Sequence, residues 1–232
     1  MIKFRDRNVR GRTQMGWLDS RHSFSFGGYH APAHMGFGSL RVINDDRVAP
    51  GAGFGEHAHQ NMEIITYVIS GAMTHQDSLG NGSVIRPGDV QRMSAGSGIR
   101  HSEFNDSATD PVHFFQIWIL HDADGGEPGY EQKTFPIADE PSVLHLVGDR
   151  DGTECAVTIH QDIRLLAGRL DDDHSLTHDF SDHRKAWLQV VRGIVHLNGG
   201  ELREGDGVAI QDEPCIFLRG SNGAELLLFE MP

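Results

Sequence analysis

Two short polar pairs, each preceded by a glycine-rich segment, constrain the fold of this 232-residue chain more than any other feature. The first is His57-Ala58-His59, which follows Gly51-Ala52-Gly53-Phe54-Gly55, and the second is His101-Ser102-Glu103, which follows Ala95-Gly96-Ser97-Gly98. Residues i and i+2 of an extended strand point to the same side, with Cα atoms roughly 6.5–7 Å apart. Two such strands lying side by side would bring all four polar side chains to one place.

These four side chains form a donor set suited to a metal ion. Bonds of about 2.0–2.2 Å from the ion, together with the imidazole and carboxylate arms, span the gap between two such positions. Three imidazoles and one carboxylate suit a divalent transition ion better than calcium or magnesium, which prefer mostly oxygen. An isolated His-x-His pair is usually two surface or half-buried histidines, but the presence of two pairs favours a metal site. We therefore expect His57, His59, His101 and Glu103 to bind one ion.

The charge and cysteine content of the chain argue against several kinds of protein. A formal net charge of −13 argues against a nucleic-acid or anionic-membrane surface, which would need a cationic stripe. Cys155 and Cys215 form no Cys-x-x-Cys, so neither a disulfide framework nor a zinc knuckle is indicated. The N-terminus lacks the apolar stretch of a signal peptide, and no run of about 18 apolar residues occurs. We expect a cytoplasmic protein with no membrane or nucleic-acid partner.

Short strands separated by glycine-rich turns predict an all-β fold. Residues 62–70 are apolar on both faces, as in a strand buried on both sides, and residues 73–77 and 83–85 form a hairpin around the turn at 79–82. Arg86-Pro87-Gly88-Asp89 has the composition of a tight turn. Residues 112–120 form the most hydrophobic strand of the chain, which we interpret as core.

Some polar and aromatic residues outside the two pairs are weaker candidates for a site. Gln116 and Trp118 share one face of the hydrophobic strand, and that face could line the metal pocket. His22, His30 and His34 have no partner at ligand spacing, so we interpret them as solvated or hydrogen-bonded histidines.

The second half of the chain reads as a copy of the first half without its ligands. Trp187-Leu188-Gln189-Val190-Val191-Arg192-Gly193 echoes Thr66-Tyr67-Val68-Ile69-Ser70-Gly71, and Arg203-Glu204-Gly205-Asp206 echoes Arg86-Pro87-Gly88-Asp89. In place of the two ligand pairs it offers only Asp182-His183-Arg184 and Gly220-Ser221-Asn222, and Asp171-Asp172-Asp173 reads as a solvated turn. We predict a metal-binding domain at residues 1–135 and a domain lacking metal ligands at residues 136–232. Two paired barrels, the second stabilising or covering the first, are stable as a monomer.

The two pairs also lie within motifs that resemble those of the cupin superfamily. The first cupin motif has a glycine, His-x-His, a glutamate and a later glycine, and it is matched with one extra residue by Gly51, His57, His59, Glu63 and Gly71. The second motif has Pro-x-Gly followed by histidine and asparagine, and it is matched, with serine in the proline position, by Gly88, Ser94, Gly96, His101 and Asn105.

Two longer segments are similar to pirins, a family with two cupin domains. These are residues 93–103, Met-Ser-Ala-Gly-Ser-Gly-Ile-Arg-His-Ser-Glu, and His22-Ser23-Phe24-Ser25-Phe26. The resemblance spans nearly the whole chain and is closest to bacterial pirin-like proteins reported as quercetin 2,3-dioxygenases. It implies two cupin (double-stranded β-helix, jelly-roll) barrels, with iron held by the residues matching His57, His59, His101 and Glu103. The ligand set implied by the resemblance does not include Glu63, although the general cupin pattern would include it as a ligand.

The function implied by this resemblance is a metal-dependent dioxygenase that opens the flavonol ring of quercetin with O2 and releases carbon monoxide. Substrate and O2 would bind at open positions of the ion. Glu103 is the candidate base for the flavonol 3-hydroxyl, or a plain fourth ligand. Two alternatives stay open: a metal-bearing, redox-sensing regulator that binds a protein partner, and another small-molecule cupin enzyme. Iron(II) is the expected ion, with copper, manganese, nickel, cobalt or zinc as alternatives.

Overall fold

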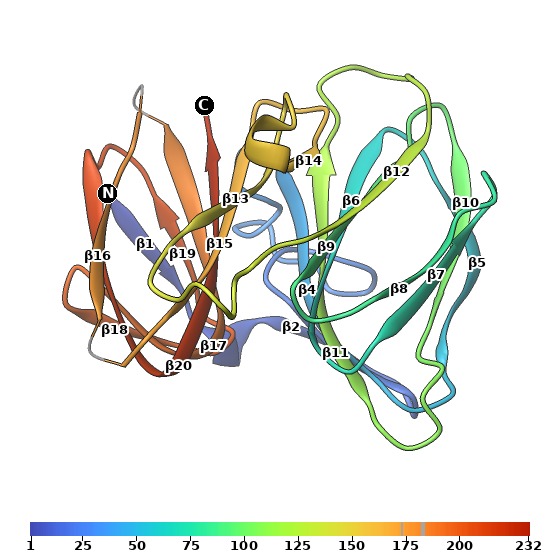
Figure 1. Ribbon diagram of the computed structural model, residues 1–232, viewed down its shortest axis with the longest axis horizontal. Coiled ribbons are helices and arrows are strands. Elements are labelled where there is room, and N and C mark those ends of the chain that lie inside the picture. Colours follow the sequence, from blue (N-terminus) through green and yellow to red (C-terminus); the bar gives the residue numbers. More distant parts are fainter. Residues whose placement is uncertain (173, 182–183) are drawn as a thin grey trace. The chain divides into compact units, whose positions relative to one another are not determined.

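The computed structural model describes residues 1–172, 174–181 and 184–232 (Figure 1). Apart from two short 3-10 turns, η1 (Arg7–Val9) and η2 (Thr153–Cys155), all its regular elements are β-strands, so the predicted all-β fold is confirmed. Among the described residues no helix has the length and apolarity needed to cross a membrane. Asp173, Asp182 and His183 lie outside the described residues. The interpretations of Asp171-Asp172-Asp173 and of Asp182-His183-Arg184 therefore fall partly outside them as well.

The chain folds into two compact units. The N-terminal unit comprises residues 11–134 and 157–161, and the C-terminal unit comprises residues 1–10, 135–156 and 162–232. The predicted domain boundary at residue 135 stays a prediction, and the compact units depart from it at two segments. Residues 1–10 belong with the C-terminal unit because β1 (Ile2–Arg5) pairs antiparallel with β19 (Gly207–Ile210). Residues 157–161 belong with the N-terminal unit. Both assignments depend on contacts between residues far apart in sequence, which leave no local sequence signal.

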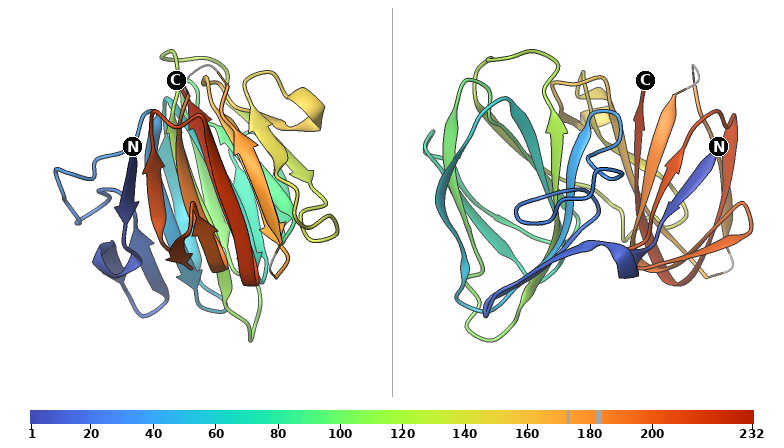
Figure 2. Two further views of the ribbon diagram at one scale, coloured as in Figure 1. Left: turned by 90° about the vertical axis from the view of Figure 1, so that its left-hand side faces the viewer. Right: turned by 180° about the vertical axis from the view of Figure 1, so that it is seen from behind.

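The N-terminal unit is built from two antiparallel sheets that face one another (Figures 1 and 2). The larger sheet has the order β12-β9-β6-β11-β4-β3-β2, and the smaller sheet has the order β5-β10-β7-β8. The strands of these two sheets are β2 (Gly11–Gln14), β3 (Leu18–His22), β4 (Leu40–Val48), β5 (Gly53–His59), β6 (Met62–Ser70), β7 (Met73–Asp77), β8 (Gly82–Ile85), β9 (Asp89–Ser94), β10 (Ile99–Phe104), β11 (Val112–Leu120) and β12 (Gly129–Thr134). The short β14 (Val157–Thr158) also belongs to this unit but to neither of these sheets.

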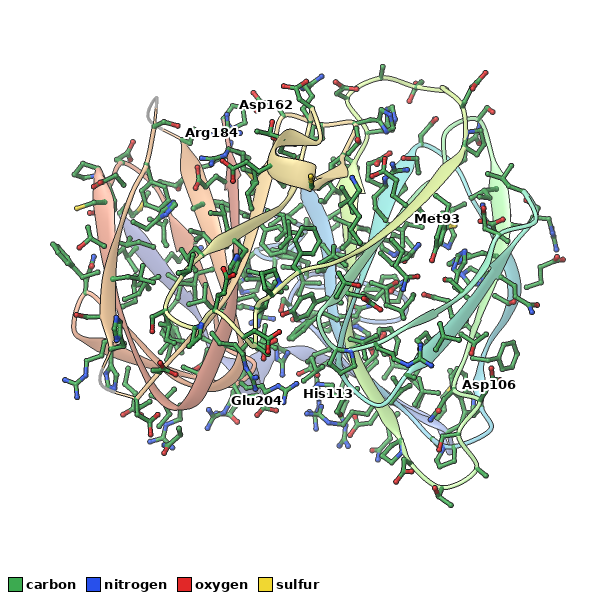
Figure 3. The ribbon with its side chains drawn as sticks, in the orientation of Figure 1. Met93, Asp106, His113, Asp162, Arg184 and Glu204 are labelled. Atoms are coloured by element: carbon green, nitrogen blue, oxygen red, sulfur yellow. The ribbon has the colours of Figure 1, made fainter. Side chains whose placement is uncertain are left out.

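The core of the N-terminal unit includes its two most hydrophobic strands. In β6 every residue from Glu63 to Ile69 is buried, and in β11 Phe114, Ile117 and Ile119 have no exposed surface, as predicted for core strands. Met93, on β9 and labelled in Figure 3, also has no exposed surface and packs with Ile64. These side chains hold the larger sheet rigid behind the smaller one, because close-packed apolar side chains resist displacement.

Two local predictions for this unit are confirmed. β7 and β8 form the expected antiparallel hairpin. The expected turn at residues 86–89 is closed by a hydrogen bond from the Asp89 amide to the Arg86 carbonyl at 2.9 Å, and the Asp89 carboxylate accepts one from the Arg86 amide at 2.9 Å. Gly88 has φ of +94°, a conformation that favours glycine.

The C-terminal unit repeats this turn. The Arg203 amide donates to the Asp206 carboxylate at 2.8 Å, the Asp206 amide donates to the Arg203 carbonyl at 2.8 Å, and Gly205 has φ of +87°. Its buried core includes Leu188 and Leu228. The strands of this unit are β1, β13 (His145–Asp149), β15 (Arg164–Leu170), β16 (Ser175–Asp179), β17 (Lys185–Leu197), β18 (Gly200–Arg203), β19 and β20 (Cys215–Met231).

Candidate metal centre

The two polar pairs lie on neighbouring strands of the smaller sheet. His57 and His59 are on β5, His101 and Glu103 are on β10, and the strands pair antiparallel with His101 directly opposite His57. Burial alternates along β10, where His101 and Glu103 are buried and the residues between and beside them are not. The alternation places both members of each pair on the same side of its strand, as the spacing predicts.

The pairing of β5 and β10 shifts register between His101 and Glu103, because Glu103 pairs with Phe54 rather than with Gly55. The backbones approach closely there. A Cβ on Gly53 would lie 2.2 Å from the Glu103 carbonyl oxygen, so only glycine fits. The irregularity also leaves the Gly55 carbonyl free to accept a hydrogen bond from His57 Nδ1 at 2.9 Å.

Three imidazoles converge beside this irregularity. His57 Nε2 lies 3.1 Å from His101 Nε2, and donor atoms of His57, His59 and His101 all lie within 4.8 Å of one another. Two nitrogens bound to one ion at about 2.1 Å, with bond angles of 90–109°, are about 3.0–3.4 Å apart. Because His57 Nδ1 donates to Gly55, its Nε2 carries a lone pair, and His59 Nε2 is buried with no hydrogen-bond partner. These residues therefore fit a metal ion.

The protonation states of these rings also suit metal binding. Burial, with a smaller effect of His57, lowers the pKa of His59 to about 4. Burial and the neighbouring imidazoles lower the pKa of His101 to about 2. Both rings are neutral at ordinary pH, and the neutral imidazole is the form that binds metals.

Glu103 is enclosed by polar side chains of two strands of the larger sheet. It is 3% exposed, and Gln116 Nε2 donates to both of its carboxylate oxygens at 3.3 and 3.1 Å. Thr66 Oγ1 donates to its Oε1 at 3.2 Å. Burial raises the pKa of Glu103 to about 7, and the hydrogen bonds from Thr66 and Gln116 oppose that rise. The carboxyl group is thus poised to gain or lose a proton near neutral pH.

The structure adds a histidine that the sequence patterns missed. His75, on β7, pairs across the sheet with Glu103 and is fully buried. Donor atoms of His75, His101 and Glu103 lie within 4.8 Å of one another, forming a second group that shares His101 with the group of three imidazoles. Glu103 is a member of this second group only. The His75-x-Asp77 spacing was a possible signal, since Asp77 Oδ2 lies 3.4 Å from His75 Nε2.

Glu63 lies on the other face of β6 from the residues that contact Glu103. Thr66, three positions along the strand, faces Glu103, so Glu63 points the opposite way. Glu63 Oε2 instead accepts a hydrogen bond from Ser94 Oγ at 2.8 Å. This position agrees with the pirin-like pattern, which leaves Glu63 out of the ligand set.

A cavity of about 560 Å³ adjoins the imidazoles in the N-terminal unit. Gln116 and Trp118 line it, and the Trp118 ring lies 4.9 Å from the His59 ring. The remaining wall includes the aromatic side chains of Trp17, Phe26 and Phe54 and the carboxyl group of Asp46.

Two polar residues of the cavity wall are held in different ways. His22 is 1% exposed and is within hydrogen-bond distance of Thr13 Oγ1 at 2.8 Å and Asn44 Oδ1 at 2.7 Å, as expected for a hydrogen-bonded histidine. Asp46 is 3% exposed, and its Oδ1 is buried without a hydrogen-bond partner. The cavity therefore combines aromatic walls with a buried carboxyl group beside the imidazoles.

Comparison with known proteins gives matches along most of the chain. The Pirin family model matches residues 3–119, and a model described as the quercetinase C-terminal cupin domain matches residues 146–231. With the observed sheets, these matches confirm the predicted fold of two cupin domains.

Several relatives match over nearly their whole length. A protein named quercetin 2,3-dioxygenase from Escherichia coli (strain K12) is 44% identical over all of this chain and 99% of its own. A pirin-like protein from Caulobacter vibrioides is 42% identical over 95% of each chain. The crystal structure of bacterial pirin YhhW from Escherichia coli in complex with nickel(II) has a TM-score of 0.94 and 44% identity, covering 100% of this chain and 99% of that one.

Proposed function

The chain belongs to the pirin family, and on that premise we propose that it is a quercetin 2,3-dioxygenase-like enzyme, which opens a flavonol ring with O2 and releases carbon monoxide. The observation that carries the proposal is the approach of His57 Nε2 to His101 Nε2, 3.1 Å apart, beside the aromatic-walled cavity. Relatives named quercetin 2,3-dioxygenase support the substrate class, a flavonol together with O2.

We propose His57, His59, His101 and Glu103 as the residues that hold the ion. The donor set and the buried, unpartnered His59 Nε2 support a divalent transition ion, and a related pirin structure contains nickel(II). Our expectation for this chain is iron(II). When bound, such an ion supplies Lewis acidity and open coordination positions for substrate and dioxygen.

Glu103 is the residue that we expect to take the proton of the flavonol 3-hydroxyl. The proton moves from the hydroxyl oxygen to a carboxylate oxygen of Glu103, leaving the electron-rich 3-olate that reacts with oxygen. In the metal-loaded protein Glu103 binds the ion as a carboxylate, so it carries no proton and can accept the one from the hydroxyl. Gln116, through its amide hydrogen bonds to both carboxylate oxygens, holds that group in place while it changes charge.

The cavity walls suit a flat aromatic substrate. Trp17 and Phe54 line one part of the cavity and pack edge to face, with ring centroids 5.1 Å apart. Phe26 and Trp118 form a similar pair at 5.4 Å. Aromatic walls of this kind bind a planar ring system and keep water away from the reacting carbons.

The proposal is tested by anaerobic reconstitution with iron(II), manganese, nickel, cobalt or copper in turn. Quercetin and oxygen are then added, and oxygen uptake and carbon monoxide are measured. We expect uptake with stoichiometric carbon monoxide in at least one metal form, lost in Glu103→Gln and in His59→Ala.

His113→Ala is the control for histidine removal, because His113 lies on β11 and bonds Asp45 at 2.7 Å outside the candidate centre. Tight metal binding with no oxygen uptake in any form would exclude quercetin as the substrate. Redox-dependent binding of a protein partner would then be the hypothesis to test.

A further inference from the structure

We propose that Glu63, His121 and His160 form a second, independent cation site, for a borderline divalent transition ion such as zinc or cobalt(II). All three residues belong to the N-terminal unit, and they share no residue with the candidate metal centre. Their donor atoms lie within 4.8 Å of one another.

The three residues come from different strands or strand ends. Glu63 is the second residue of β6, and His121 directly follows β11, whose Ile119 pairs with Glu63. His160 follows β14 by two positions and is 97 residues from Glu63 in sequence. Two hydrogen bonds already join the histidine-bearing segments: the Asp122 amide donates to the His160 carbonyl at 3.1 Å, and Gln161 Nε2 donates to the Leu120 carbonyl at 2.8 Å.

The distances between donor atoms match those of ligands around one ion. Glu63 Oε1 lies 3.5 Å from His121 Nε2 and 3.3 Å from His160 Nδ1. Ligands bound to one ion at about 2.0–2.2 Å with tetrahedral angles lie about 3.3–3.6 Å apart. The His121 and His160 rings stack, with centroids 5.2 Å apart and planes at 20°. Each ring presents one nitrogen to Glu63 Oε1.

The Glu63 carboxylate is held so that one oxygen remains for an ion. Glu63 has no exposed surface. Its Oε2 accepts the Ser94 hydroxyl proton at 2.8 Å, Arg92 Nη1 donates to Ser94 Oγ at 2.8 Å, and Arg92 Nε lies 4.0 Å from Oε2. The positive charge of Arg92 thus faces Oε2, while Oε1 faces the two imidazoles. Supporting hydrogen bonds of this kind orient metal-binding carboxylates.

Each histidine can bind the ion through one ring nitrogen while the other ring nitrogen carries the proton. His121 binds the ion through Nε2 when its Nδ1 carries the proton, and the Asp122 carboxylate lies 3.7 Å from that Nδ1. In this tautomer His121 Nδ1 no longer accepts the hydrogen bond from the Ala123 amide, which is 3.3 Å long in the ion-free structure. His160 binds through Nδ1, which in the ion-free network lies 3.0 Å from Ser94 Oγ, and its proton moves to Nε2. The His160 side chain is 45% exposed, which provides a route for the ion.

The chemistry of the donors selects the class of ion. Two imidazole nitrogens and one carboxylate oxygen suit zinc, cobalt(II) or nickel(II), whereas calcium and magnesium prefer mostly oxygen. Three protein ligands leave at least one position for water. Through His160, His121 and Glu63, such an ion would link residues 157–161 and the end of β11 to β6.

The test is metal stoichiometry, measured by equilibrium dialysis of chelator-treated full-length protein with zinc, followed by elemental analysis. Wild type is expected to bind two ions per chain. His101→Ala and His160→Ala are each expected to bind one, and the variant that carries both substitutions is expected to bind none at the same zinc concentration. Glu63→Gln, which keeps the shape of the side chain, is expected to weaken this site at least about tenfold. Cobalt(II) absorption bands give a second readout, because each site contributes its own spectrum.

His113→Ala is the matched control (His113 is labelled in Figure 3), since His113 also bonds a buried carboxylate, Asp45, but belongs to no group of three ligands among the described residues. It is expected to bind two ions. The proposal is overturned if His101→Ala binds no ion, or if His160→Ala and Glu63→Gln bind as much zinc as wild type. Glu63, His121 and His160 would then form a hydrogen-bonded network only. This stoichiometry does not depend on quercetin turnover.

Discussion

His57 Nε2 and His101 Nε2 face each other at 3.1 Å across β5 and β10. His57 donates its other ring proton to Gly55, and burial holds the pKa of His101 at about 2, so an added proton does not readily bridge the two nitrogens. In the metal-free protein the two nitrogens share a hydrogen bond, and an ion between them replaces that bond with two metal–nitrogen bonds. We therefore predict that metal binding stabilises the folded protein through His101.

At a metal concentration a hundredfold above Kd, binding adds about 2.7 kcal/mol to the free energy of unfolding. For a chain of this length we expect a rise in Tm of about 5–10 °C from this site. His101→Ala removes that part of the rise, whereas Ser102→Ala, one position along β10 and outside both ligand groups, keeps it. Thermal unfolding with and without nickel(II) measures the difference. Equal shifts in wild type and His101→Ala would contradict the prediction.

Strand periodicity was enough to predict that His57 and His59, and likewise His101 and Glu103, lie on the same side of their strands. The i, i+2 rule depends only on local backbone geometry. The register of β5 against β10, with its shift beside Glu103, could not be predicted, because it depends on the close approach of Gly53 to another strand. The prediction of these four residues as ligands remains to be tested.

The residues that sequence reasoning missed are brought in by packing between distant segments. His75 reaches Glu103 through the pairing of β7 with β10. Asp46 reaches the cavity from β4. Asn44-Asp45-Asp46 has the composition of a turn, yet β4 continues through all three residues to Val48, because pairing with β11 outweighs their turn propensity.

A second prediction concerns the proton on Glu103. With a pKa of about 7 in the metal-free protein, Glu103 holds about 0.9 proton at pH 6 and about 0.1 at pH 8. A cation bound by its carboxylate displaces that proton. Wild type is therefore expected to release about 0.9 more protons than Glu103→Gln on binding metal at pH 6, and about 0.1 more at pH 8.

Calorimetric titration at each pH, in two buffers with different ionisation enthalpies, gives the number of protons released. A proton count that is the same in Glu103→Gln as in wild type at pH 6 would show that Glu103 does not bind the ion as a carboxylate.

A third prediction concerns Gln116, whose amide donates to both oxygens of Glu103. Gln116→Leu removes these hydrogen bonds, so the pKa of Glu103 rises further and the carboxylate is less well oriented. We expect metal affinity to fall about 10- to 100-fold at neutral pH. The loss becomes smaller as pH rises, because the carboxyl group ionises. Gln76→Leu, at an exposed position of β7, is the control and keeps wild-type affinity.

A fourth prediction is a change in the pH dependence of stability through Asp46. Burial, with smaller contributions from the nearby acids Asp45 and Glu103, raises the pKa of Asp46 to about 8. Its unfolded value is about 3.9, so between about pH 4 and 8 the folded state binds more protons than the unfolded state. The stabilisation by this proton is full below the unfolded pKa and is lost as pH rises through 8. Asp46→Asn removes the dependence.

Urea unfolding of metal-free protein at pH 5 and pH 7.5 measures this effect. Over that range wild type should lose up to about 3 kcal/mol more stability than Asp46→Asn. Asp19→Asn is the control, because the Arg12 guanidinium lowers the pKa of Asp19 and its titration falls below this window. A parallel pH dependence of wild type and Asp46→Asn would show that Asp46 is ionised in the folded protein.

A fifth prediction concerns substrate binding at Trp17, which lines the cavity and packs edge to face on Phe54. Trp17→Ala removes an aromatic wall that contacts a flat substrate but no group that transfers a proton. The loss of about 1.4 kcal/mol expected for such a contact weakens binding about tenfold. KM for quercetin should therefore rise about tenfold while kcat stays near the wild-type value.

Anaerobic titration of the metal-loaded protein with quercetin measures the same loss without turnover. Phe217→Ala, at a 59% exposed position of β20, serves as the control and leaves binding unchanged. If Trp17→Ala lowers kcat and leaves the quercetin Kd unchanged, the substrate does not lie against Trp17, and the cavity beside His59 binds it in another orientation.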